Sequence, residues 1–197
     1  MRWNRSIALA AALVLCGCEG VGIVATDDPY AKLSQADYLL NEAGRVMQAR
    51  RQVDEAVPIL EQRQDRAGLG QAYRLYGLLA LAGGMNDDMV IVRDPKAPLR
   101  PTAAELDLSD EYLLRALPLI EEARAFDVAF NINYLLARNQ VVRGAPQKSC
   151  PYYARAFAFY EKARAEHPDR VPVTNSAGAD AGEELRDMQR QAGCTPS

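Results

Sequence analysis

The chain has 197 residues, of which 49% are hydrophobic and 25% are charged. This length is typical of one domain with a sizeable core, and the apolar fraction excludes a mostly disordered chain. A formal net charge of −3 gives no indication of nucleic-acid binding. The chain has a single histidine, His167, which excludes zinc sites that need two histidines. A Ser-His-Asp triad would have to use His167 as its base.

The N-terminus has the organisation of a secretory signal peptide. Arg2 and Arg5 form a basic start, and the apolar residues 6–15 follow directly. This apolar stretch is shorter than the about 20 residues that a transmembrane helix needs, and no later run in the chain approaches that length. We therefore expect residues 1–17 to be a signal peptide that is removed.

The residues that follow, Leu15-Cys16-Gly17-Cys18, resemble the lipobox of bacterial lipoproteins. They place an aliphatic residue three positions before Cys18 and a small residue directly before it. The resemblance implies that Cys18 becomes the new N-terminus and is lipidated, with palmitate among its three acyl chains. Several acyl chains give stable membrane attachment, whereas one gives only marginal binding. The alternative is an ordinary secreted protein that is cleaved after Gly17.

The residue directly after the lipidation site indicates which of the two membranes would hold the protein. In lipoproteins of this type an aspartate there often retains the protein in the inner membrane, and this chain has Glu19 instead. The resemblance therefore implies an outer-membrane protein that faces the periplasm. Residues 18–28 form only a short tether, so the domain must lie close to the bilayer.

From Asp28 onward, apolar residues recur at helical spacing. Asp28 before Pro29 is a typical helix start, since aspartate caps the first turn and proline tolerates the first helical position. The only strand-like triplet is 90–92, and it stands alone. The expected helices span residues 29–43, 47–62, 69–82, 109–123, 127–142, 151–165 and 178–192.

Two cysteines remain after the lipidation site, Cys150 and Cys194. An exported protein occupies an oxidising compartment, where thiols pair. If helices 152–166 and 178–192 form an antiparallel hairpin, its end brings the two cysteines together. We therefore predict a disulfide that holds the last helix; two free thiols or a metal pair are the alternatives, and no nearby ligand cluster favours a metal.

The helical segments repeat along the chain. Residues 56–61 match residues 116–121 and, more loosely, residues 156–161. Residues 72–79 match residues 129–136. If an insertion at about 85–108 is set aside, each unit has near 36–40 residues, which is typical of a helix-turn-helix repeat.

This pattern resembles degenerate tetratricopeptide repeats (TPR). Tyr73, Gly77 and residues 80–81 lie near the Trp, Gly and Tyr positions of the first TPR helix. Tyr160 with His167-Pro168 resembles the end of the second helix and its closing proline. The resemblance implies an all-α domain over residues 29–197, with antiparallel helical hairpins stacked as a short right-handed solenoid.

The chain departs from the TPR pattern in two respects. Tyr134 replaces the small residue of the first helix, and Pro58 and Pro118 fall inside second helices, where proline removes a backbone hydrogen bond. The alternative is an unrelated helical bundle with similar spacing.

No constellation of residues indicates catalysis. The acidic pairs are adjacent in sequence, so their side chains diverge, and there is no phosphate-binding glycine loop, calcium loop or nucleophile elbow. Asp107 and Asp110 suit a helix start, and His167 suits a helix C-terminus. We expect no metal and no cofactor.

The expected function follows from the architecture. Stacked hairpins present a concave face, on which arginine and asparagine suit a peptide backbone or a carboxylate. We predict a membrane-anchored periplasmic scaffold that binds a protein or peptide partner in cell-envelope assembly or secretion. A binder of small molecules or cell-wall fragments is the alternative, and an enzyme is the least supported class. The predicted partner-binding residues are Gln71, Arg74, Asn131, Arg138 and Asn139.

Overall fold

The computed structural model describes residues 24–41, 44–85, 101–167 and 180–195. The predicted signal peptide, the lipidation site Cys18 and the strand-like triplet 90–92 lie outside these ranges. Of the predicted insertion, residues 86–100 also lie outside them.

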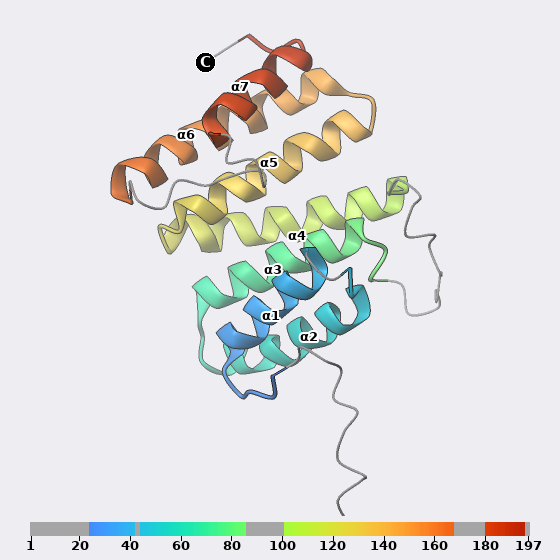
Figure 1. The fold of residues 1–197 in the computed structure, drawn as a ribbon, viewed down its shortest axis with the longest axis vertical. Helices are drawn as coiled ribbons and strands as arrows, with labels where there is room; N and C mark the ends of the chain where they lie inside the picture. Colours follow the sequence, from blue (N-terminus) through green and yellow to red (C-terminus); the bar gives the residue numbers. More distant parts are fainter. Residues whose placement is uncertain (1–23, 42–43, 86–100, 168–179, 196–197) are drawn as a thin grey trace, which may run out of the picture.

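The described residues are helical, as expected, and contain no β-strand. Within the described ranges, seven α-helices and one short 3₁₀ helix, η1, follow one another (Figure 1). Their bounds are α1 Pro29–Asn41, α2 Val46–Gln62, α3 Arg66–Leu81, α4 Ala103–Glu122, α5 Phe126–Val142, η1 Pro146–Ser149, α6 Cys150–Glu166 and α7 Ala181–Gln191.

Aspartate caps begin several of these helices. The Asp28 carboxylate accepts a hydrogen bond from the backbone N–H of Tyr30, so α1 begins at Pro29 as predicted. Asp65 and Asp180 accept hydrogen bonds from backbone N–H groups in the first turns of α3 and α7 in the same way. Each cap satisfies a donor that the helix itself leaves unpaired.

The start of α4 corrects the sequence analysis. We expected this helix to begin near Ser109, but it begins at Ala103, six residues earlier. Thr102 and Glu105 form a capping box, in which each side chain accepts a hydrogen bond from the other residue's backbone N–H. Asp107 and Asp110 therefore lie inside the helix rather than at its start, and residues 103–108 of the predicted insertion are helical.

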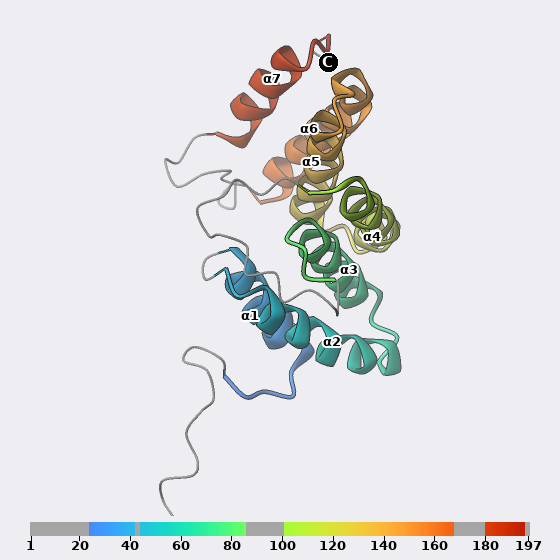
Figure 2. The same ribbon diagram turned by 90° about the vertical axis from the view of Figure 1, so that its right-hand side faces the viewer.

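The helices pack as sequence neighbours. α1 packs on α2, α3 on α4, and α5 on α6, while α2 also contacts α3, α4 contacts α5, and α7 contacts α6. Figure 1 shows these pairs arranged along the long axis, from α1 and α2 at one end to α6 and α7 at the other. α1 also lies beside α3, two elements further along the chain. In Figure 2, α1 and α7 lie on the same side of the molecule.

Two glycines of α3 allow α4 to pack closely against it. A Cβ atom built on Gly77 of α3 would lie 2.8 Å from Leu113 Cγ of α4, and one built on Gly70 would lie 2.8 Å from Ile120 Cδ1. Both distances are shorter than real carbon contacts. The two glycines are seven residues apart and therefore lie on one face of α3, along which α4 packs.

Two groups of buried side chains form the core. One contains residues of α1, α2 and α3, such as Leu39 and Leu60, and the other contains residues of α4 to α7, such as Leu113 and Leu136. Leu78 of α3 packs against both groups. The core is therefore continuous across α3, and the described helices form one packed body.

The predicted pairing of Cys150 and Cys194 is confirmed. The two sulfur atoms lie at bonding distance, with 5.5 Å between the Cα atoms. Cys150 is the first residue of α6, and Cys194 follows the end of α7. The bond therefore ties the end of α7 to the beginning of α6, as the hairpin argument required.

Candidate functional site

A cleft of about 260 Å³ is formed by α1, α3 and α5 near their C-terminal ends. We refer to it as the α1/α3/α5 cleft. Its lining is mainly aliphatic, with Leu40 from α1, Leu78 and Leu81 from α3, and Leu135 and Val142 from α5. Among the described residues, its polar lining consists of Asn41, Arg138 and Asn139.

The two amide side chains of the cleft donate their hydrogen bonds within the protein. Asn41 Nδ2 donates to Asp37 Oδ1 at 3.1 Å. Asn139 Nδ2 donates to Ser109 Oγ at 3.1 Å and to Asp110 Oδ1 at 2.7 Å, both on α4. Both amide N–H groups of Asn139 and one of Asn41 are therefore used by the fold.

Arg138 is the charged group of the cleft. It is the only ionisable side chain among the described residues that line this cleft, and it is exposed. Its guanidinium carbon lies 5.8 Å from the ring centroid of Tyr134, a cation–π contact, and no described carboxylate forms an ion pair with it. Its charge is therefore available to an anionic group that enters the cleft.

Arg74 has a different role. Its Nη2 lies 3.0 Å from Asp37 Oδ1 of α1, and its Nη1 donates to Asn131 Oδ1 of α5 at 3.4 Å. Only 16% of its side chain is exposed. Arg74 and Asn131 therefore connect three helices of the fold, and Asp37 neutralises the arginine charge.

The structure thus divides the five residues predicted to bind a partner. It brings Arg138 and Asn139 to one cleft, and places the half-buried Gln71, Arg74 and Asn131 outside its lining. Asn139 needs a correction, because its side chain is 2% exposed and held by α4 rather than presented on an open face. The aliphatic lining was missed, although Leu135 and Val142 are seven residues apart and therefore share one face of a helix.

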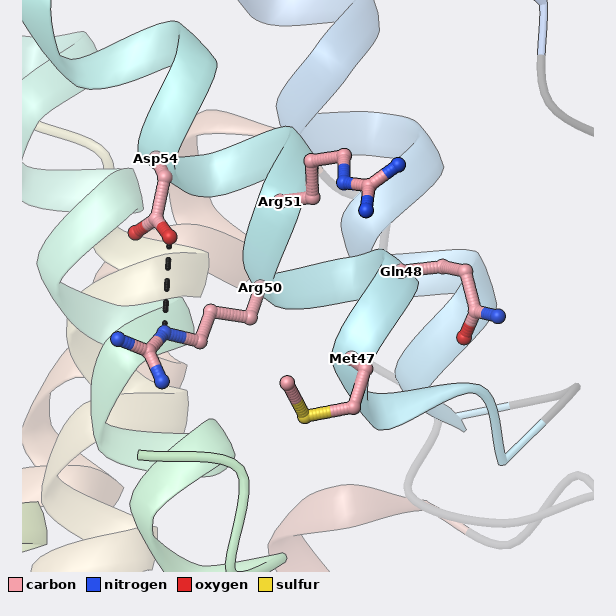
Figure 3. Close-up of a pocket in the computed structure, with 5 residues that line it drawn as sticks. All are labelled: Met47, Gln48, Arg50, Arg51 and Asp54. Carbon is pink, nitrogen blue, oxygen red and sulfur yellow. Dashed lines mark ion pairs between the residues drawn. The ribbon is translucent and has the colours of Figure 1, made fainter. Parts of the chain in front are cut away.

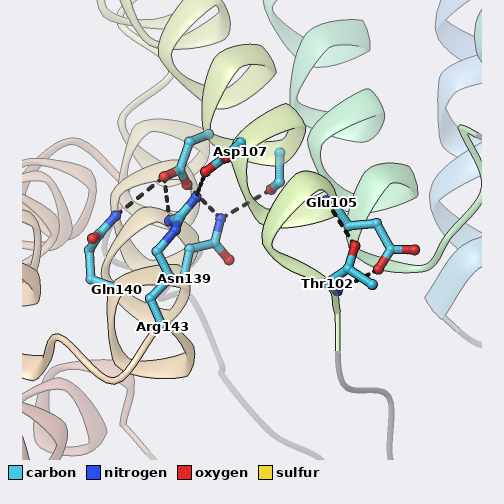
Figure 4. A network of polar contacts seen from close by, with 8 residues as sticks. Thr102, Glu105, Asp107, Asn139, Gln140 and Arg143 are labelled. Carbon is cyan, nitrogen blue, oxygen red and sulfur yellow. Dashed lines mark hydrogen bonds and ion pairs between the residues drawn. The ribbon is translucent and has the colours of Figure 1, made fainter.

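A polar network fixes the part of α5 that forms the cleft (Figure 4). Arg143 donates to Asp107 Oδ1 at 2.8 Å and to Asp110 Oδ2 at 2.6 Å, and Gln140 Nε2 donates to the same Asp110 oxygen at 3.2 Å. Burial alone would lower the pKa of Arg143, but its hydrogen bonds to the two aspartates raise that pKa. The network holds the end of α5 against the beginning of α4.

A second cavity, of about 340 Å³, is bordered by described residues of α2 alone (Figure 3). Its lining includes Met47, Arg50, Arg51 and Asp54, and the Arg50 guanidinium pairs with Asp54 at 3.5 Å. Tyr76 of α3 donates to Asp54 Oδ1 at 2.7 Å, so this carboxylate already has two partners. In the described part of the chain, no side chain from a second helix converges on this cavity.

A third cavity, of about 110 Å³, contains the only histidine. His167 caps the C-terminus of α6, as its sequence position indicated, and its backbone N–H donates to the Ala163 carbonyl at 2.8 Å. Arg124 and Glu166 form an ion pair beside it. In the described ranges, no three histidine, cysteine or acidic residues are grouped as metal ligands would be.

No protein-family model, curated protein or solved structure matches the chain. Among the helices of the described ranges, none combines the length and the apolar character needed to cross a bilayer.

Proposed function

We propose that this chain is a lipid-anchored, periplasm-facing scaffold that binds a protein or peptide partner in cell-envelope assembly or secretion. The observation that carries the proposal is the α1/α3/α5 cleft, which combines an aliphatic lining with the exposed Arg138, an arginine that forms no ion pair with any described carboxylate. Side chains that anchor a protein–protein interface usually fill well-packed pockets from which water is excluded.

The arrangement of helix pairs supports a TPR-like solenoid as the architecture of this scaffold. The pairs α1–α2, α3–α4 and α5–α6 follow one another, and α1, α3 and α5 together line the cleft, as the first helices of repeats would. Gly77, at the small position of the proposed repeat, packs closely on Leu113 of the second helix. Pro58 and Pro118 lie at matching places in α2 and α4.

A small-molecule or cell-wall-fragment binder has less support from the geometry. The cleft volume of about 260 Å³ is below the roughly 300–1,000 Å³ usual for small-molecule sites. The cleft is better suited to part of a larger ligand than to a whole small molecule.

Affinity capture from solubilised envelopes tests the partner-binding function. We expect a stoichiometric protein partner with the native chain and strongly reduced capture with Arg138→Glu, which reverses the charge of the cleft. The matched control is Arg51→Glu, an exposed arginine on α2 outside the cleft. Arg74→Glu is not a suitable variant, because it would place two carboxylates together at Asp37 and disturb the fold. Equal capture by both variants would contradict binding at the cleft.

Labelling with palmitate tests the anchor. The proposal requires that the native chain incorporates the label and that Cys18→Ala does not. Incorporation into Cys18→Ala would overturn the assignment of the lipidation site.

A further inference from the structure

The size of the α1/α3/α5 cleft indicates how much of a partner it can accept. It is open to solvent, and five aliphatic side chains from three helices border it. Burying a leucine or isoleucine side chain among such groups gains about 1.5–3 kcal/mol. The cleft is therefore suited to one aliphatic anchor, with the rest of the partner lying outside.

The charge of the cleft indicates what lies next to that anchor. Arg138 is its one charged side chain in the described part of the chain, and no described residue neutralises it. The last carbonyls of α3 and α5 carry partial negative charge, but backbone N–H groups of Gly84 and Ala145 cap them. An anionic group thus gains an ion pair at the cleft, whereas a cation would meet Arg138.

Apolar surface continues beyond the cleft along the end of α5. Val142, which lines the cleft, is 52% exposed, and the adjacent Val141 is 41% exposed. Exposed apolar groups that adjoin a cleft are characteristic of protein interaction sites. This continuation favours a polypeptide, which extends past its anchor residue, over a compact free ligand.

We propose that the α1/α3/α5 cleft binds a partner polypeptide through one aliphatic side chain flanked by an acidic side chain, whose carboxylate pairs with Arg138. This inference rests on the proposed function and specifies the chemistry of its partner. The aliphatic side chain occupies the space between Leu78, Leu81 and Leu135, and the carboxylate lies at the cleft margin.

Methyl NMR of the full chain, with its disulfide intact, tests this chemistry directly. The leucine and valine residues of the cleft supply the reporter signals, and the deeply buried Leu60 supplies a reference signal. The probe is the blocked tripeptide acetyl-Glu-Leu-Glu-amide, which carries a carboxylate on each side of the leucine. We expect its titration to shift the cleft methyl signals in a saturable manner and to leave the Leu60 signal in place.

Two related probes separate the contributions of charge and anchor. Replacing both glutamates of the probe with glutamine should weaken binding about fivefold, the value of a charge pair with an exposed partner. Replacing its leucine with alanine should weaken binding about tenfold through lost apolar burial. In the Arg138→Gln chain the glutamate and glutamine probes should bind equally, whereas Arg51→Gln should retain the difference.

Several results would overturn the inference. One is that the native chain binds the glutamate and glutamine probes equally, shows no saturable binding, or shows methyl shifts only outside the cleft. Another is that Arg51→Gln abolishes the difference between the two probes as fully as Arg138→Gln does. Each of these results contradicts the inference. Tighter binding of octanoate than of the tripeptide would assign the cleft to a free aliphatic carboxylate instead. If the chain captures a partner in cells but does not distinguish the probes, this inference is wrong and the proposed function stands. If it binds the probes selectively but captures no partner, the proposed function is wrong and the cleft chemistry stands.

Discussion

Removal of the Cys150–Cys194 bond should release α7 and lower the stability of the whole domain. The two cysteines are 44 residues apart in sequence. In the chain-entropy model, opening a loop of that length costs about 4 kcal/mol of unfolding free energy. At about 2–4 °C per kcal/mol for a domain of this size, the melting temperature should fall by about 8–16 °C.

The structure also indicates which part opens first. α7 packs mainly on α6, through the buried Leu185 and the hydrogen bond from Tyr160 Oη to Asp180 Oδ1 at 2.6 Å. Without the disulfide, α7 is held mainly by its packing on α6, and its 11 residues are too few for a helix that is stable by itself. We therefore expect α7 to open locally before the remaining helices unfold.

Chemical denaturation followed by circular dichroism, with the double variant Cys150→Ser and Cys194→Ser, measures the first effect. Tryptic cleavage at Arg186 and Arg190, both in α7, measures the second. A phosphine reductant should reproduce both effects in the native chain and change nothing in the double variant. A loss of stability below about 1 kcal/mol, together with protected α7 arginines, would refute the entropic argument.

Three further predictions concern other parts of the fold. Gly77→Val should destabilise the protein by about 1–3 kcal/mol, because a Cβ there would overlap Leu113, while Gly144→Asn, at a positive φ with open space, should change thermal stability by about 0.5 kcal/mol or less. Asp110→Ala should lower the free energy of unfolding, measured by chemical denaturation, by about 2 kcal/mol, because Arg143 loses a mostly buried partner. The control Asp187→Ala breaks an exposed ion pair and should lower it by less than about 0.5 kcal/mol. Equal effects of the two variants would contradict the role given to the network. Burial and hydrogen bonds to aspartates raise the pKa of Tyr30 to about 12 and the pKa of Tyr76 well above its usual range. Because the folded state favours the neutral phenols, their contribution to stability is complete below about pH 10 and is lost as the pH rises further. Phenolate absorbance in native and denatured protein measures this difference, and identical titration curves would disprove it.

The all-helical character of the described residues was predictable from the sequence because its signals are local. Apolar spacing of three and four residues marked the seven helices, and Asp28 with Pro29 marked the start of α1. The disulfide followed because each cysteine adjoins a helix end. The start of α4 was missed, although Thr102 and Glu105 have the spacing of a capping box, because residues up to about 108 were assigned to the insertion.

The candidate site was only partly predictable, because its properties depend on contacts between distant residues. Helical register placed Arg74 and Arg138 on the same face, but only the structure shows that Asp37 neutralises Arg74 and that Arg138 has no such partner in the described ranges. Asn139 has the helical register of a cleft residue and lines the cleft. Its side chain is nevertheless held by Ser109 and Asp110 of α4, about 30 residues away in the sequence. Attention to polar residues alone also concealed the aliphatic lining of the cleft.

Site-specific photo-crosslinking in living cells tests the central claim most directly. A photoreactive residue at position 142 lies at the cleft, and one at position 114 lies on α4; the native residues, Val142 and Leu114, are 52% and 48% exposed. If a partner docks at the α1/α3/α5 cleft, mass spectrometry should identify one envelope protein linked to position 142, lost on Arg138→Glu and absent at position 114. Equal crosslinking at both positions, or no crosslink at position 142, would contradict the claim.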